Sequence, residues 1–321
     1  MRRVCGAASC VLAVLALLGA GCKREGPYPS REIRLIVHAS PGGISDAVSR
    51  HAARALQAEL GVPVVCENRA GAAGSVALTY VAKSRADGYT IGYAPVDLAI
   101  VPHLGYARVS PDDFDFLVRH TRAPASLAVR SDSPWRSLDE LVRDAREKPG
   151  AVNVATSGMG SIWHLASLAL ARAARVQLNY VPYAGSGQAV TALLGSHVHA
   201  VVAGPAEVQA HVEAGTLRVL GVMSDDRSPI FAQVPTFQEQ GYELQIDAWG
   251  GFLAPKGVPT ERTQKLIAAM TRVIASDDFQ RFCRERGLEI DLLAGEEFRD
   301  FAGSEFRAFG DLMKQTGLAR P

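Results

Sequence analysis

The feature that most constrains the fold of this chain is a regular alternation of short apolar stretches with longer amphipathic ones. Residues 34–38 predict a buried strand, residues 45–60 carry apolar side chains at helical spacing, and residues 62–67 predict a second strand. A predicted helix at 74–84 and a predicted strand at 89–93 continue the pattern. Such a strand–helix–strand succession builds a parallel sheet with right-handed crossovers. The sequence therefore predicts an α/β fold.

The alternation resumes further along the chain, which is long enough for more than one core. Predicted strands lie near 152–155, 178–181, 198–203, 217–223 and 248–253, and predicted helices near 138–146, 162–174, 188–194, 205–214, 260–275, 277–286 and 295–316. A mature chain of about 300 residues is typical of two domains. We expect one lobe from 28–124 plus 249–321 and a second from 125–248, joined by strands that cross between them.

The first residues have the composition of an export signal. Two arginines precede an apolar run at 11–18, and small residues then lead to Cys22. This arrangement indicates a signal peptide at 1–21, followed by a polar tether at 22–30. The apolar run is too short to span a bilayer. Cleavage before Cys22 with lipidation would tether the protein to a membrane without spanning it, whereas simple cleavage would release it.

Charge and cysteine usage exclude two classes of function. The net charge of +1 becomes −1 once the predicted signal, which holds two arginines and no acid, is removed. A near-neutral chain lacks the basic surface that nucleic-acid binding requires. No cysteine pair has metal-ligand spacing, and His197 and His199 have no third ligand near them in sequence. We therefore expect no metal site, and Cys66 and Cys283 form either one disulfide or two buried free thiols.

Glycine-rich turns follow four of the predicted strands and are the candidate binding elements. They lie at residues 40–43, 69–74, 156–161 and 184–187. In open α/β sheets, ligands bind beyond the carboxyl ends of strands, where these turns precede helix starts with unpaired N–H groups. A helix start contributes up to about 2 kcal/mol toward an anion, and a charged hydrogen bond about 1.5–3 kcal/mol. Converging turns would support micromolar binding; alternatively, the glycines only form tight corners.

Several short motifs occur in an order that is specific to one family. They are Tyr28-Pro29, IRLIV at 33–37, PGGISD at 41–46, ENRAGAAG at 67–74, DGYT at 87–90, VPYAG at 181–185, VPT at 234–236 and AWGGFLAP at 248–255. This ordered set covers essentially the whole mature chain. It resembles the Bug proteins, or TctC family, which are the periplasmic receptors of tripartite tricarboxylate transporters.

The resemblance implies a type II periplasmic-binding-protein fold, in which two α/β lobes joined by a two-strand hinge enclose a ligand cleft. It implies a monomeric, periplasmic solute-binding receptor that captures a small organic carboxylate for membrane permease subunits, with no catalytic residue, cofactor or metal. The family holds the carboxylate with backbone groups and waters at opposed loops. Carried to this sequence, the ligand-binding residues are Pro41, Gly42, Gly43, Ser45, Asp46, Thr156, Ser157, Gly158, Gly160, Ser161, His164, Ala184, Gly185 and Ser186.

Three departures from the family pattern concern the cleft. Ala184 stands where relatives often carry lysine, and Ala203-Gly204 where they commonly carry a polar or acidic residue. Ala94-Pro95 replaces a frequent serine or threonine. Because these positions are less polar than in relatives, we expect a ligand with one carboxylate and a more apolar body.

Three side chains of the predicted cleft have two interpretations each. Asp46, one turn into a predicted helix, either stabilises the helix start or selects an amino group or bridging water of the ligand. His164 either donates to a bound anion or holds its loop through a backbone carbonyl. Trp249 either stacks on the ligand or packs at the junction of the lobes.

Two other classes of function remain to be weighed. A hydrolase would need a nucleophile, and Ser157 and Ser161 lie near His164 in sequence. However, the Gly-x-Ser-x-Gly motif is absent around them, and the histidine of a catalytic triad normally comes from a separate element. The turn at 156–161 is no dinucleotide site either, because Trp163 stands where the third glycine belongs. We therefore expect no enzyme. A ligand-sensing subunit for a membrane signalling partner would use the same cleft and stays an alternative.

Overall fold

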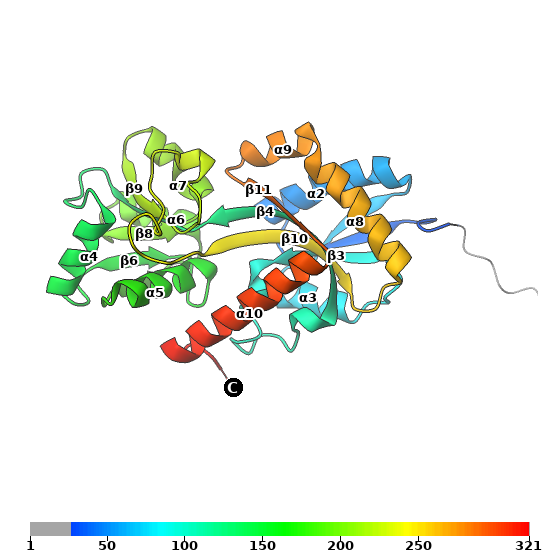
Figure 1. The fold of residues 1–321 in the computed structure, drawn as a ribbon, viewed down its shortest axis with the longest axis horizontal. Helices are drawn as coiled ribbons and strands as arrows, with labels where there is room; N and C mark the ends of the chain where they lie inside the picture. Colours follow the sequence, from blue (N-terminus) through cyan, green and yellow to red (C-terminus); the bar gives the residue numbers. More distant parts are fainter. Residues whose placement is uncertain (1–26, 321) are drawn as a thin grey trace, which may run out of the picture.

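Two β-sheets, each covered by helices, form the two lobes of the chain (Figure 1). The computed structural model describes residues 27–320. The predicted signal peptide, the predicted lipid anchor at Cys22 and the tether up to residue 26 lie outside the described residues. Within residues 27–320, no helix combines the length and the apolar character needed to cross a membrane.

A six-stranded sheet in the order β11-β4-β10-β3-β1-β2 forms the first lobe. β1 runs parallel to β2 and β3, and β10 runs antiparallel to β3 and β4. The strands are β1 (Ile33–Val37), β2 (Val64–Asn68), β3 (Thr90–Pro95), β4 (Phe114–Pro124), β10 (Asp247–Pro255) and β11 (Glu289–Ala294). The helices are α2 (Ile44–Leu60), α3 (Ser75–Ala82), α8 (Thr260–Ala275), α9 (Asp277–Arg284) and α10 (Glu296–Thr316), with 3₁₀ segments η1 (Ala72–Gly74), η2 (Val96–Ala99) and η3 (Pro111–Asp113).

The apolar run of β1 explains why helices cover both faces of this sheet. Ile33, Leu35 and Val37 are buried in a core with α2 and α8, whereas Ile36 is buried in the opposite core with α3. Successive side chains of a strand point to opposite faces, so a strand with buried apolar side chains on both faces requires a helix layer on each side. The predicted α/β class is therefore confirmed for this lobe.

A five-stranded sheet in the order β7-β6-β8-β5-β9 forms the second lobe. β6 runs parallel to β7 and β8, and β5 runs antiparallel to β8 and β9. The strands are β5 (Ser126–Arg130), β6 (Asn153–Thr156), β7 (Asn179–Pro182), β8 (Ala200–Ala203) and β9 (Leu217–Val222). The helices are α4 (Leu138–Glu147), α5 (Ile162–Ala174), α6 (Ser186–Leu194) and α7 (Pro205–Glu213), with the 3₁₀ segment η4 (Pro229–Phe231).

The chain crosses between the lobes twice, on neighbouring segments. β4 continues through Ala125 into β5, and the chain returns through Ile246 into β10. The N–H of Ala125 donates to the carbonyl of Ile246 at 2.9 Å, and the N–H of Met223 donates to the carbonyl of Ala125 at 2.8 Å. The two crossings are thus bonded side by side, which is the two-strand connection that the sequence led us to expect.

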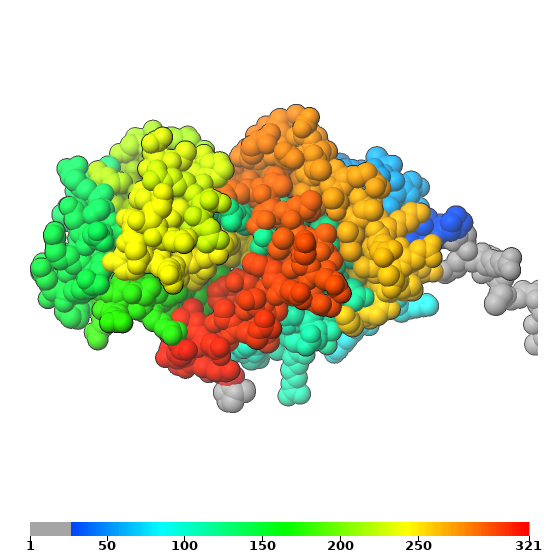
Figure 2. All heavy atoms as spheres, viewed as in Figure 1, coloured from blue at the N-terminus to red at the C-terminus, as the bar shows by residue number. Residues whose placement is uncertain are grey.

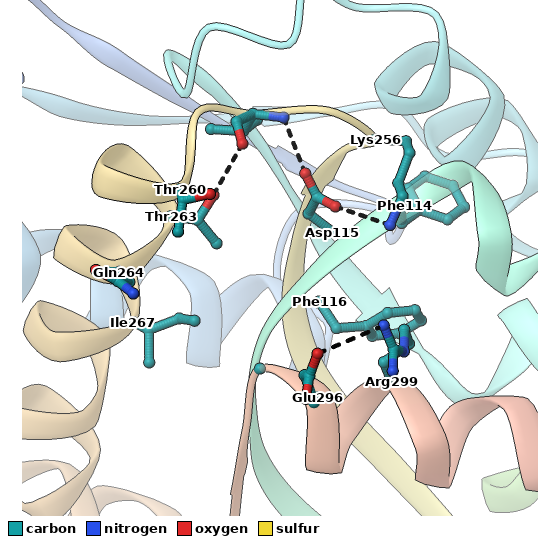
Figure 3. A pocket seen from close by; sticks show the side chains of 12 residues that line it. Phe114, Asp115, Phe116, Lys256, Thr260, Thr263, Gln264, Ile267, Glu296 and Arg299 are labelled. Atoms are coloured by element: carbon teal, nitrogen blue, oxygen red, sulfur yellow. Dashed lines mark hydrogen bonds and ion pairs between the residues drawn. The ribbon is translucent and has the colours of Figure 1, made fainter.

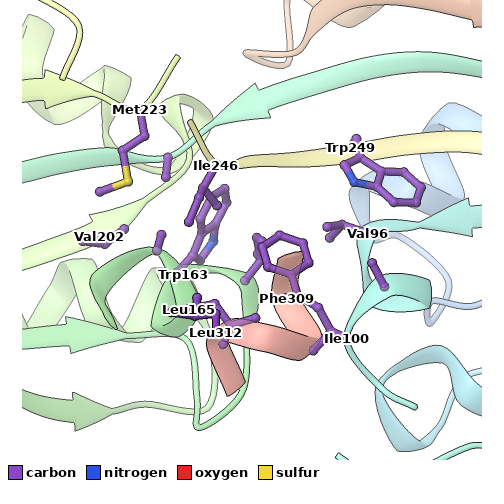
Figure 4. Close-up of a cluster of buried hydrophobic side chains, with 14 of the residues drawn as sticks. Val96, Ile100, Trp163, Leu165, Val202, Met223, Ile246, Trp249, Phe309 and Leu312 are labelled. Atoms are coloured by element: carbon purple, nitrogen blue, oxygen red, sulfur yellow. The ribbon is translucent and has the colours of Figure 1, made fainter. Parts of the chain in front are cut away.

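The C-terminal helix α10 makes a further contact between the lobes. It starts beside the six-stranded sheet and reaches α5 of the second lobe (Figure 1). Phe309 and Leu312 of α10 lie in a buried cluster with Trp163 and Leu165 of α5 (Figure 4). The hydrophobic core is therefore continuous across the junction of the lobes.

The two described cysteines are both free. Cys66 lies partly exposed on β2 and Cys283 is buried in α9. Burial raises the pKa of the Cys66 thiol to about 11 and that of the Cys283 thiol to about 12. Thiols with raised pKa values stay protonated and unreactive at neutral pH. Of the two alternatives that the sequence left open, the structure shows free thiols.

Candidate functional site

A cavity of about 400 Å³ lies between the lobes and is the candidate binding site. We call it the interlobe cavity. His38, Ser45, Tyr93 and Asp97 of the first lobe line it, together with Trp163 and Glu207 of the second lobe and Trp249 of β10. Figure 2 shows the notch at which the yellow-green second lobe meets the orange α9. A concave space of several hundred Å³ between lobes is the usual setting of a small-molecule site.

Asp46 braces the first glycine-rich turn. Its carboxylate is 3% exposed and accepts hydrogen bonds from the Gly42 N–H at 3.0 Å, from Arg50 Nε at 3.0 Å and from Asn68 Nδ2 at 2.8 Å. Burial by itself would raise the pKa of Asp46, but these hydrogen bonds to Arg50, Gly42 and Asn68 together hold that pKa below its ordinary value. Asp46 therefore stabilises the turn and the start of α2.

Replacing Asp46 with asparagine is expected to lower the free energy of unfolding by about 1–3 kcal/mol at pH 7, because charged hydrogen bonds to a buried group are lost. The folded-state pKa of Asp46 is lower than that of the unfolded chain, so its charge stabilises the fold above about pH 4 and the contribution disappears at lower pH. Urea denaturation from pH 3 to pH 8 should show the unfolding free energies of the two proteins converging at the acid end.

Asp132→Asn is the control, since that carboxylate pairs with Arg130 but is 66% exposed, and the change should leave the free energy of unfolding the same. A gap between wild type and Asp46→Asn that stayed constant from pH 8 down to pH 3 would contradict the role of the charge.

His38, Ser45 and Tyr93 lie together in the first-lobe wall of the interlobe cavity. Ser45 hydrogen-bonds to Tyr93, whose pKa is raised to about 12 by burial. His38 packs against Tyr93 with ring centroids 5.0 Å apart, and burial lowers the pKa of His38 to about 4. His38 is therefore a neutral imidazole at pH 7. Its Nδ1 atom is buried and has no hydrogen-bond partner within residues 27–320.

Five of the predicted ligand contacts belong to this first turn, and only one of them lines the cavity. Ser45 lines the interlobe cavity. Pro41, Gly42 and Gly43 are exposed beside it and do not line it, and Asp46 lies behind the turn. His38 was missed, although a polar residue that ends an apolar strand just before a glycine turn is a usable signal.

The second-lobe turn at 157–161 is closed by its own hydrogen bonds. The Ser157 hydroxyl donates to Ser161 Oγ at 3.0 Å, and Ser161 Oγ accepts from the His164 N–H at 3.2 Å, which caps α5. The Gly160 N–H donates to His164 Nδ1 at 3.0 Å. His164 thus holds its loop, through a backbone N–H rather than through the expected carbonyl. Burial lowers its pKa, so it is neutral at pH 7.

The turn at 157–161 packs against the other lobe and not into the interlobe cavity. A Cβ added at Gly160 would lie 2.8 Å from Leu104 Cδ1, and Gly160 adopts a φ of +76°. α5 reaches the cavity through Ile162 and Trp163. The residues of this region that were predicted as ligand contacts and lie outside the cavity lining are Thr156, Ser157, Gly158, Gly160, Ser161 and His164.

These contacts also bear on hydrolysis. A serine nucleophile needs its hydroxyl hydrogen-bonded to a basic nitrogen of histidine. Here the hydroxyl of Ser157 donates to Ser161, and the Nδ1 atom of His164 accepts from a backbone N–H. The geometry required of a serine–histidine pair is therefore not formed by these three side chains.

The turn before α6 contributes to the interlobe cavity through a partner. Ala184, Gly185 and Ser186 do not line it, but the Ser186 hydroxyl hydrogen-bonds to the carboxylate of Glu207, which does. Glu207 also accepts from the Gly204 N–H, so its side chain caps the start of α7. Burial nevertheless raises the pKa of Glu207.

Two acids give the cavity a polarity that the sequence comparison did not predict. We expected a less polar cleft because of the residues at 94–95, 184 and 203–204. The structure adds Asp97 from η2 and Glu207 from α7. Burial raises the pKa of Asp97 to about 6. Among the lining residues, all of which belong to the described part of the chain, there is no lysine or arginine.

Trp249 packs at the junction of the lobes, and it also reaches the interlobe cavity. Its ring packs edge-to-face on Phe298 and Phe301 of α10, with centroids 5.6 and 5.7 Å apart. The residue is 3% exposed and also lines the interlobe cavity. It therefore fixes the junction of the lobes and supplies an aromatic wall.

A second cavity of about 360 Å³ lies on the first lobe, between the start of β4, α8 and the start of α10 (Figure 3). Its charges are already paired. Asp115 accepts from the N–H groups of Gly257 and Val258 at 2.8 and 2.9 Å and pairs with Lys256 at 3.1 Å. Since these contacts hold the β10–α8 loop, we assign the cavity a structural role. Within residues 27–320 no group of three or more histidine, cysteine, aspartate or glutamate residues could hold a metal ion.

Comparison with known sequences finds one family and close relatives. The tripartite tricarboxylate transporter family receptor matches residues 48–318. A UPF0065 protein in the tcbD-tcbE intergenic region of a Pseudomonas strain is 35% identical over 303 residues, which is 92% of this chain and 89% of that protein. Protein BugT of Bordetella pertussis is 33% identical over 297 residues, 90% of each chain.

Solved structures with the same architecture are solute-binding proteins. A TctC solute binding protein from Polaromonas has a TM-score of 0.84 at 30% identity and covers 90% of this chain and 99% of its own. An R. palustris protein with adipate has a TM-score of 0.77 at 28% identity, covering 91% and 99%. MatC from Rhodopseudomonas palustris with bound malate has a TM-score of 0.72 at 27% identity, covering 89% and 99%. The predicted periplasmic-binding-protein fold is confirmed.

Proposed function

Because the chain belongs to the tripartite tricarboxylate transporter receptor family, we propose that it captures a small organic carboxylate in the interlobe cavity and delivers it to a membrane transporter. The family consists of periplasmic solute-binding receptors and not of enzymes. Adipate and malate in two structural neighbours support a small organic acid as the ligand. The observation that carries the proposal is a cavity of suitable size walled by both lobes and both crossings.

The start of α2 is the place for the carboxylate. The N–H of Gly42 is used by Asp46, and that of Gly43 donates to Ser40 O at 3.3 Å, but the following amides belong to the first turn of the helix, where no intrahelical acceptor exists. Ser45 and His38 lie beside them in the cavity wall. Backbone N–H groups, the positive end of the helix dipole and a neutral imidazole together suit an anion without a cationic side chain.

The accompanying features complete this proposal. The receptor consists of one lobe from 28–124 plus 249–321 and another from 125–248, which close on the ligand about the paired crossings. The predicted signal at 1–21 exports it, and a lipidated Cys22 tethers it near its transporter. Of the predicted ligand-binding residues between Pro41 and Ser186, Ser45 contacts the ligand directly. The others hold the turns that shape the cavity.

Isothermal titration of the mature protein with a panel of mono- and dicarboxylates tests the function. At least one acid should bind with a micromolar Kd and raise the melting temperature. Ser45→Val should weaken that binding roughly tenfold, because a hydrogen bond to a charged ligand is lost. The control is Thr263→Val, which also replaces a hydroxyl-bearing side chain by valine but in the second cavity. Failure of the whole panel would overturn the ligand class, and weakening by Thr263→Val in place of Ser45→Val would overturn the site.

A further inference from the structure

The charge of the interlobe cavity points to a narrower class of ligand. Its wall contains two carboxyl groups, Asp97 from the first lobe and Glu207 from the second, and no lysine or arginine among the described residues that line it. A carboxylate that leaves water must find a cation or hydrogen-bond donors. A second carboxylate on the ligand would instead meet two acids.

Glu207 occupies the anion position of the second lobe. Its carboxyl accepts from the N–H of Gly204 and from the hydroxyl of Ser186, so the start of α7 is already filled. A Cβ at position 204 would lie 2.6 Å from Glu207 Oε2 and 3.1 Å from Trp163 Cζ2. The missing side chain of Gly204 therefore makes room for the Glu207 carboxyl beside the Trp163 ring, in the wall of the cavity.

The remaining walls suit a cation as well. Tyr93, Trp163 and Trp249 line the cavity and are 7%, 5% and 3% exposed. Aromatic faces attract ammonium groups, most strongly where water is excluded. His38 lines the same cavity and contributes its imidazole ring to the wall.

We infer that the interlobe cavity selects a zwitterion, a carboxylate that also carries an ammonium group, and that Glu207 and Asp97 recognise the ammonium. This inference rests on the proposed function. The carboxylate lies at the start of α2, as proposed above, and the ammonium lies toward the two acids. A dicarboxylate of the same length places its second charge against Glu207 and is rejected.

Four carboxylates with five carbons in the main chain, two of which also carry an amino group, form the test. Pentanoate, glutarate, 5-aminopentanoate and norvaline are titrated into the mature protein at pH 7.5. We expect one of the two amino acids to bind at least about tenfold more tightly than both pentanoate and glutarate, the size of effect typical of a charged hydrogen bond. Glu207→Gln and Asp97→Asn should each lower the affinity for that amino acid at least about tenfold and leave pentanoate unchanged or tighter.

Glu213→Gln is the matched control, because Glu213 lies on α7 like Glu207 but outside the cavity. It should leave every affinity unchanged. Equal or tighter binding of glutarate or pentanoate in the wild type would overturn the inference while the receptor function stands. A preference that survives both Glu207→Gln and Asp97→Asn would also overturn it. If neither these four compounds nor the wider carboxylate panel binds, the proposed function falls too. Melting temperatures without ligand show whether either variant acts through the fold.

Discussion

Replacing Gly251 with valine is expected to lower the free energy of unfolding by about 3 kcal/mol or more, because β10 has no space for a side chain there. A Cβ at this position would lie 2.5 Å from two ring carbons of Phe298 and 2.6 Å from the carbonyl oxygen of Val118. Phe298 is fully buried, and the carbonyl belongs to the neighbouring strand β4. Neither atom can retreat without separating β10 from β4 or α10 from the sheet.

The measurement for Gly251→Val is the midpoint of urea denaturation followed by circular dichroism. Gly187→Ala is the matched control, since an added Cβ at this position in α6 meets no atom within 4 Å. Alanine is the better helix former, so this control should keep or raise the stability, by up to about 1 kcal/mol. A Gly251→Val protein as stable as the control would mean that β10 and β4 are not packed as described.

Replacing Phe309 with alanine is expected to lower the free energy of unfolding by about 3–5 kcal/mol. Phe309 is 4% exposed and lies in the cluster that joins α10 to α5 (Figure 4). Its removal deletes buried apolar surface and leaves a cavity in the cluster that joins the two helices. Hydrogen exchange should therefore accelerate in α5 as well as in α10.

Met159→Ala is the control for Phe309→Ala. Met159 is 58% exposed on the second-lobe turn, so its removal should change the stability by no more than about 0.5 kcal/mol. Faster exchange confined to α10 in the Phe309→Ala protein would show that the helix does not couple the two lobes.

Most apolar strands of the fold were predicted from sequence, but the apolar β5 and the charged β4 were not. β1 and β3 follow mainly apolar stretches, and a glycine-rich turn at 40–43 follows β1. No strand was predicted at β4, because Arg119, His120 and Arg122 interrupt its apolar pattern. Arg119 and Arg122 pair with Asp291 and Glu289 of β11, which are 172 and 167 residues away. A single sequence does not reveal pairing over that separation.

The candidate site was predictable as a region but not as a set of contacts. Glycine turns pointed to the start of α2, where Ser45 lines the interlobe cavity. At 157–161 the same type of turn is satisfied by Ser161 and His164, and its glycine packs on Leu104. Glu207 was missed because its role depends on the space left by Gly204 and on the hydroxyl of Ser186, and neither is visible in a periodic pattern.

The central position of β10 has a consequence for the order in which the molecule assembles. β10 joins β3 to β4, yet it follows the entire second lobe in the sequence. A polypeptide synthesised from its N-terminus therefore presents β1, β2 and β3 long before β10, the strand that joins them to β4. The second lobe is formed by one continuous segment and can fold early. The edge of β3 stays unpaired until β10 is available. Assembly of the first lobe is thus the slow, aggregation-sensitive event in the biogenesis of this receptor.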